Sequence, residues 1–107
     1  TGWHLPSSDE WETLLTTVGK DNASTVLFSK TGWDGGRNGT DKYGFSALPA
    51  GGKVDFGVYL GAGTDAYFWT SSEKYSSSAD VAHLTFGLAI VSDDGKFAGY
   101  SVRCIMD

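Results

Sequence analysis

The oxygen-rich segment WDGGRNGTD, residues 33–41, is the clearest candidate for chemistry in this sequence. Asp34, Asn38 and Asp41 offer side-chain oxygens, and the glycines between them let the backbone wrap closely. Hard cations prefer such ligands, so the pattern is compatible with a calcium site. Asp and Asn are also common in turns, because their side chains bond to the neighbouring backbone. The spacing differs from that of a helix–loop–helix calcium loop and no glutamate closes the segment, so a plain turn and a calcium site both stay open.

The two histidines, His4 and His83, are the only candidates for imidazole chemistry. His4 is close in sequence to Asp9 and Glu10, but both carboxylates already suit the first turn of a helix. His83 occupies an alternating position in an apolar strand. The sequence has no HExxH motif, no phosphate loop and no GxSxG motif. We therefore predict one structural and one surface histidine, and a protein that is not an enzyme.

Cys104 is the only cysteine, so the chain can form neither an internal disulfide nor a two-thiol metal or redox site. A lone cysteine is commonly a buried thiol, which is the simplest expectation. The alternative is a cysteine whose partner lies outside these 107 residues.

Exposed loops offer a second kind of function, which is recognition. Tyr75 precedes the serine run Ser76–Ser78, and this composition is typical of recognition loops, where aromatic faces contact a sugar or a protein. The glycine-rich segment adds charged and polar side chains. The candidate ligand contacts are Asp34, Arg37, Asn38, Asp41 and Tyr75.

Length and charge narrow the class of protein. A chain of 107 residues forms one domain, residues 1–107, with a single core. The net charge of −5 and the scattered basic residues argue against nucleic-acid binding. No apolar run approaches the ~20 residues that cross a bilayer. The sequence contains no signal peptide, as expected of a mature secreted domain or an excised fragment. We expect a monomer or part of a longer chain.

The elements that position these residues begin with a helix. Ser7 and Glu10 have the spacing of a capping box, and Pro6 and Trp11 that of a hydrophobic staple. Residues 11, 14, 15 and 18 form one apolar stripe, which Gly19 ends as a C-cap. A shorter helix is predicted over residues 22–29, capped by Asp21 or Asn22.

The rest of the chain is predicted to be a loop followed by strands. Residues 30–52 contain seven glycines and little periodicity, which indicates a long irregular loop packed by its own aromatic side chains. Strands are expected over residues 54–60, 67–73, 81–86, 88–92 and 97–106, with a serine-rich turn over 74–80. Asp94–Gly95 predicts a hairpin between the last two strands. Helices followed by antiparallel strands indicate an α+β fold.

Four separated motifs resemble a known family. GWHLPSSDEWETL, GTDKYGFSALPAGG, FWTSSE and GYSVRCIMD follow one another along the chain. In this order they resemble the Fibrobacter succinogenes major paralogous domain. That family occurs in secreted and surface-attached proteins, often lipoproteins, of Bacteroidetes and Fibrobacteres, and its biochemical role is largely unknown. The resemblance therefore implies an extracellular domain.

The layout is also similar to the formylglycine-generating-enzyme-like branch of the C-type lectin fold. The matching residues are Leu5–Pro6, Glu10–Trp11, Trp69–Ser71 and Arg103. In that fold they are structural, and they pin the first helix to the sheet and close the termini together. The resemblance implies a C-type-lectin-like fold with one or two N-terminal helices packed on a small antiparallel sheet, with long irregular loops.

The activities of that wider group do not carry over to this chain. The copper enzymes use two cysteines, the related iron enzymes use three histidines, and the calcium lectins use EPN or QPD with WND; the chain has none of these sets. The family resemblance further implies a disulfide from Cys104 to a cysteine before Thr1. The expected function is a non-catalytic binding or display domain for a glycan or protein ligand. The alternatives are a structural module of a larger surface protein, or a divergent enzyme that has lost its metal site.

Overall fold

A three-stranded antiparallel sheet forms the centre of the molecule. The computed structural model describes residues 2–54 and 57–107. Its long strands, β4 (Asp65–Tyr75), β5 (Ser78–Thr85) and β6 (Leu88–Gly95), pair in that order. The β5–β6 turn has only two residues, and the second, Gly87, has a positive φ, which glycine adopts readily.

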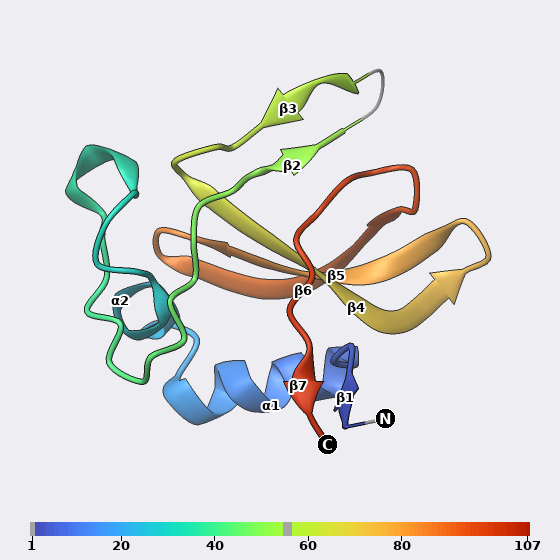
Figure 1. The fold of residues 1–107 in the computed structure, drawn as a ribbon, viewed down its shortest axis with the longest axis horizontal. Helices are drawn as coiled ribbons and strands as arrows, with labels where there is room; N and C mark the ends of the chain where they lie inside the picture. The colour runs from blue at the N-terminus through green and yellow to red at the C-terminus, as the bar shows by residue number, and fades with distance from the viewer. Residues whose placement is uncertain (1, 55–56) are drawn as a thin grey trace.

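Two helices and a small hairpin cover the sheet. The helices α1 (Ser8–Val18) and α2 (Ala23–Leu27) pack against it. The short strands β2 (Gly52–Lys53) and β3 (Tyr59–Leu60) pair with each other, and they lie across the sheet from α1 (Figure 1). This arrangement confirms the predicted α+β class. None of the helices in the described ranges is long and apolar enough to span a membrane.

The two ends of the chain lie side by side. The strands β1 (Trp3–His4) and β7 (Ile105–Met106) form an antiparallel pair next to the start of α1 (Figure 1). The pairing extends past the strands, because the Asp107 amide donates to the Gly2 carbonyl at 2.9 Å. A feature made from opposite ends of the sequence therefore stands beside the first turn of α1.

The start of α1 follows its local sequence closely. The Glu10 amide donates to Ser7 Oγ at 3.2 Å, and Glu10 Oε1 accepts from the Ser7 amide at 2.9 Å, which confirms the capping box. Trp11 and Leu15 are buried, as the apolar stripe requires. Gly19 ends the helix with a positive φ, and its amide donates to the Thr16 carbonyl.

The second helix and its cap differ in detail from the prediction. α2 spans five residues, and Asn22 occupies the N-cap position without making a side-chain cap hydrogen bond. Asn22 has helical backbone angles, so its side chain cannot reach over the first turn as an extended capping residue does. Burial of Ala23 and Leu27 against the sheet holds this short helix in place.

The irregular loop is confirmed, although its own aromatic residues hold it only in part. Trp33 and a short 3₁₀ turn, η1 (Asp34–Gly36), are anchored on residues outside the loop, because the Trp33 ring stacks on Phe28. Tyr43 and Leu48 are exposed instead of packed. Gly39 passes so close to Phe28 that a Cβ there would lie 2.6 Å from the Phe28 backbone oxygen.

Alternation along β4 decides which side chains face the helices. Ala66, Phe68 and Thr70 are buried, whereas the residues between them are half-buried on the opposite face. Phe68 stacks on Trp11 with ring centroids 5.2 Å apart, and Phe45 from the loop meets both rings edge-on. This aromatic cluster joins α1, the loop and the sheet.

Three predicted strand features are wrong. The strand predicted over residues 54–60 is reduced to β3, which covers only Tyr59–Leu60, and residues 55–56 lie outside the described residues. Residues 97–106 cross other segments through single bridges at Gly99 and Ser101, and only β7 is a strand. Asp94–Gly95 ends β6, where Gly95 pairs with Ser78, so it does not join two paired strands. This segment meets β2 and β4 only at those two positions, so its apolar alternation does not come from a continuous strand.

Candidate functional site

The predicted contact residues of the loop do not form one cluster. Asp34 and Arg37 line a cavity of about 170 Å³ next to Phe86, and the Arg37 guanidinium lies 4.3 Å from the Phe86 ring centroid. Asn38 and Asp41 do not line this cavity. Tyr75 is exposed at the β4–β5 turn, which lies at the opposite end of the sheet from η1 (Figure 1).

Two of the three residues proposed for calcium, Asn38 and Asp41, make side-chain hydrogen bonds within the loop. Asn38 Oδ1 accepts from the Trp33 amide at 2.9 Å, and the Asp41 carboxylate accepts from both the amide and the hydroxyl of Ser46. These bonds from Ser46 lower the pKa of Asp41. Within residues 2–54 and 57–107, no group of three or more His, Cys, Asp or Glu side chains is placed to hold a metal. Calcium binding by Asp34, Asn38 and Asp41 stays a prediction.

His4 does pair with carboxylates, contrary to the expectation from the sequence. Its Nδ1 lies 2.7 Å from Asp107 Oδ1, and its Nε2 lies 3.0 Å from Glu10 Oε2. These hydrogen bonds, the stronger from Asp107, raise the pKa of His4. Glu10 both caps the helix and binds His4, because a carboxylate has enough acceptor sites for two partners. The cluster is exposed and ties the two chain ends to α1.

His83 belongs to a polar and aromatic stack on the sheet face opposite the helices. Its Nε2 lies 2.9 Å from Asp65 Oδ1, and its ring stacks on Tyr67 with centroids 4.3 Å apart. Tyr100 covers the Tyr67 ring and donates its hydroxyl to Asp94. Burial would raise the pKa of Asp65, but the hydrogen bonds from His83 and Thr64 lower it on balance. His83 is half-buried in this stack, and its structural role stays a prediction.

Cys104 is exposed, so the expectation of a buried thiol is wrong. It follows Arg103 in the terminal segment, whose path is set by backbone contacts and by the β1–β7 pair. In that segment Arg103 and Ile105 are half-buried, and the residues on either side of Arg103 turn outward.

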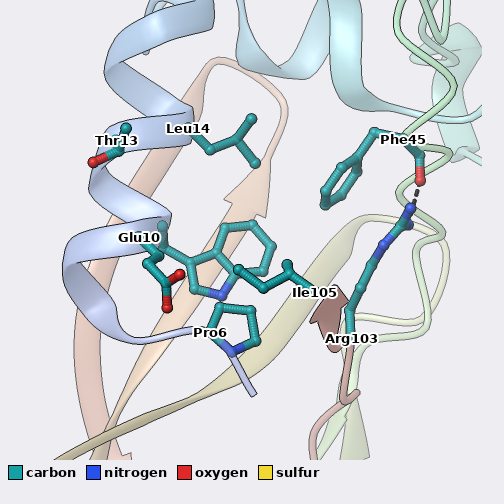
Figure 2. Close-up of a pocket in the computed structure, with 8 residues that line it drawn as sticks. Pro6, Glu10, Thr13, Leu14, Phe45, Arg103 and Ile105 are labelled. Carbon is teal, nitrogen blue, oxygen red and sulfur yellow. Dashed lines mark hydrogen bonds between the residues drawn. The ribbon is translucent and has the colours of Figure 1, made fainter. Parts of the chain in front are cut away.

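A larger cavity, of about 440 Å³, opens between α1, the loop and the terminal segment. Figure 2 shows Glu10, Thr13 and Leu14 along the helix on one side, with Phe45 and Arg103 on the other. Its volume lies within the range of ~300–1,000 Å³ that is usual for ligand pockets. We call it the α1 pocket, and its lining residues are Pro6, Glu10, Trp11, Thr13, Leu14, Phe45, Arg103 and Ile105.

The walls of the α1 pocket are mostly carbon, with one charge on each side. Glu10 contributes a carboxylate on the helix side, where its pKa is lowered first by the Ser7 amide and then by His4. Arg103 lies opposite, with its guanidinium 4.0 Å from the Phe45 ring centroid and a hydrogen bond to the Phe45 carbonyl. An apolar cavity with few polar groups is suited to holding a ligand in one orientation.

Sequence reasoning missed this pocket because its walls come from three distant segments. It assigned Pro6 and Trp11 to a helix staple, and both residues indeed lie in one wall. One available signal was the indole N–H of Trp11, which needs an acceptor wherever the ring is buried. A second was Arg103, a cation in a segment with alternating apolar residues.

Comparison with known proteins assigns the family. The model of the Fibrobacter succinogenes major domain matches residues 1–106, so the chain belongs to that family. No curated protein and no solved structure matches the chain.

Proposed function

We propose that this chain is a non-catalytic, extracellular binding or display domain of a secreted or surface-attached bacterial protein, with a glycan or protein ligand. The α1 pocket is the observation that carries the proposal. It has a ligand-sized volume and apolar walls, and α1 forms one side of it. The family resemblance adds the cell-surface setting, a lipoprotein context and a source in Bacteroidetes as parts of the proposal.

The side chains of the α1 pocket favour binding over chemistry. Its ionisable groups, Glu10 and Arg103, already hold the helix cap, His4 and the Phe45 carbonyl. A general acid or base needs a free proton site within reach of a substrate. Side chains that are committed to the scaffold serve better as fixed charges that orient a ligand.

A C-type-lectin-like fold is part of the same proposal. Its support is the arrangement of two helices on a small antiparallel sheet, long loops and paired chain ends. The β1–β7 pair also favours a second function, that of a structural module in a larger surface protein. A longer chain would enter and leave this domain at one place, so the domain could be repeated or inserted without disturbing its neighbours.

Two threonines on α1 provide a matched test. Thr13 and Thr17 are both exposed, and each donates its hydroxyl to the carbonyl four residues earlier. Thr13 lines the α1 pocket and Thr17 does not. We expect Thr13→Trp to cover the pocket mouth and abolish ligand binding, whereas Thr17→Trp keeps it.

The screen should present glycans on an array and peptides on a second surface, with the wild type and both variants. Circular dichroism should first show that the three proteins have the same fold. Binding to either surface that is lost only in Thr13→Trp supports the proposal. An absence of binding to both, or equal binding by the two variants, refutes a role for the α1 pocket and leaves the structural module as the better account.

A further inference from the structure

His4 lies between two carboxylates that come from opposite ends of the sequence. Its Nδ1 lies 2.7 Å from Asp107 Oδ1, and its Nε2 lies 3.0 Å from Glu10 Oε2. An ionised carboxylate only accepts hydrogen bonds, whereas a neutral imidazole has one donor and one acceptor nitrogen. Only a ring that is protonated at both nitrogens can therefore donate to both partners. The hydrogen bonds to Asp107 and then to Glu10 accordingly raise the pKa of His4.

The charged groups that face the ring favour its protonated form. Among the described residues, α1 contributes Glu10 and the segment after β7 contributes Asp107, whereas β1 adds no other ionisable side chain. Within these ranges, His4 is the only cation in an ion pair with either carboxylate. Arg103, on the same terminal segment, instead donates to the Phe45 carbonyl across the α1 pocket (Figure 2). We call His4, Glu10 and Asp107 the His4 cluster.

The His4 cluster anchors the paired ends of the chain. His4 pairs with Ile105 across the β1–β7 ribbon, and Asp107 Oδ2 accepts from the Gly2 amide at 2.9 Å. Each strand of the ribbon has only two residues. Because even a longer two-stranded ribbon is marginally stable on its own, its attachment to α1 through Glu10 contributes to keeping the ends together.

We propose that the His4 cluster is a pH-sensitive latch, which fastens the β1–β7 ribbon to α1 while the ring is protonated at both nitrogens. Loss of one proton leaves a nitrogen lone pair facing a carboxylate, so one of the two attractive contacts becomes repulsive. The hold is complete below the ordinary pKa of 6.5 and is lost as the pH rises through the higher folded value. Opening is confined to the ribbon, because the central sheet is held by its own strand pairs.

The latch also bears on the α1 pocket. Glu10 and Ile105 both line the pocket, and His4 bonds to the first and pairs with the second. Release of the ribbon would therefore move the Ile105 side of the pocket and leave the α1 side in place. Control of ligand binding by pH follows from this and rests on the proposed function. The latch itself does not rest on it, and its test uses no ligand.

The experiment follows side-chain NMR signals of the intact 107-residue protein from about pH 5 to about pH 9. We expect the His4 ring to titrate with a midpoint above 6.5. Met106 is the only methionine and lies opposite Trp3 in the ribbon, so its methyl signal reports opening. The methyl signals of Met106 and Ile105 should shift with the midpoint of His4. The open share should rise about threefold or more, a modest factor because exposed ion pairs contribute little.

Variants then locate the contacts. Glu10→Gln keeps the helix cap, because a capping box accepts glutamine as well as glutamate. Its amide can donate to a neutral imidazole, so the midpoint of His4 should fall and the ribbon should open less at high pH. Asp107→Asn should lower the midpoint for the same reason. His4→Gln should abolish the pH response of the ribbon methyl signals. His83→Gln is the matched control, because His83 bonds to Asp65 on the far face of the sheet, and it should keep the response.

Three results would overturn the latch. A His4 midpoint at or below 6.5 excludes a ring held in its protonated form by two carboxylates. Methyl signals that do not follow the His4 titration, or that respond equally in His4→Gln, exclude its coupling to the ribbon. A midpoint that neither Glu10→Gln nor Asp107→Asn lowers excludes the two contacts. The ligand screen can fail while the latch is found, and the reverse, so the two failures are distinguishable.

Discussion

Replacement of Trp33 tests how the irregular loop, and with it one wall of the α1 pocket, is held in place. The Trp33 ring is 5% exposed and stacks on Phe28 with centroids 3.5 Å apart. Its N–H donates to Ser29 Oγ and to the Ala47 carbonyl, at 3.1 Å each. Truncation of such a buried ring costs about 3–5 kcal/mol. Trp33→Ala should therefore lower the free energy of unfolding by about 4 kcal/mol.

Trp33→Phe separates the two contributions. Phenylalanine keeps a ring on Phe28 but loses the N–H, and each lost hydrogen bond costs about 0.5–1.5 kcal/mol. The expected loss is therefore about 1–3 kcal/mol. The Ala47 carbonyl is not left unpaired, because it also accepts from the Ser29 amide at 3.0 Å. The phenylalanine variant should thus lie between the wild type and Trp33→Ala.

The measurement is urea unfolding followed by circular dichroism, with thermal melting alongside. A domain of this size loses about 4–8 °C per kcal/mol, so Trp33→Ala should melt about 15–30 °C lower. Tyr43→Ala is the control, because Tyr43 belongs to the same loop but is 61% exposed. It should change stability by less than about 0.5 kcal/mol. A loss below about 1 kcal/mol for Trp33→Ala, or an equal loss for Tyr43→Ala, would refute this account of the loop.

Three further predictions concern charges, calcium and the thiol. The raised pKa of His4 means that its stabilising effect is complete below its ordinary value of 6.5 and is lost as the pH rises through the folded value. The melting temperature should therefore fall more between about pH 6 and about pH 9 in the wild type than in His4→Gln, and equal slopes would contradict the pairing. Glu10 acts oppositely, because its lowered pKa gives stability above 4.5 that is lost as the pH falls. If residues 34–41 bind calcium, melting midpoints with calcium and with a chelator should differ by several degrees, and identical midpoints would exclude the site. Cys104 should react with a thiol reagent in the folded protein about as fast as in urea, since it is exposed, and protection in the folded state would count against its placement.

The features that the sequence predicted well depend on residues close together in the chain. The Ser7–Glu10 capping box and the Gly19 C-cap each involve contacts within a few positions, so the local pattern contains all the required information. The pattern of the last predicted strand was misleading, because pairing of a strand depends on residues far away in the sequence. Residues 97–106 alternate as a strand does, but they meet the edge of the central sheet only through one bridge from Ser101 to Phe68, and their last two residues pair with β1 instead. Which segment a strand pairs with is decided by the whole fold and cannot be read from the local pattern.

The α1 pocket and the His4 cluster show a different limit of sequence-based prediction. It concerns how many hydrogen bonds one side chain can make. From the sequence, no contact between Glu10 and His4 was expected, because Glu10 already takes part in the helix cap. A carboxylate has two oxygens and several lone pairs, however, so Glu10 serves the Ser7 amide and the His4 ring together. One hydrogen bond to a carboxylate is therefore a weak reason to expect no second one. The indole of Trp11 is different, because it has a single N–H and no acceptor function. That N–H either has a partner or lacks one, and among the described residues it lacks one.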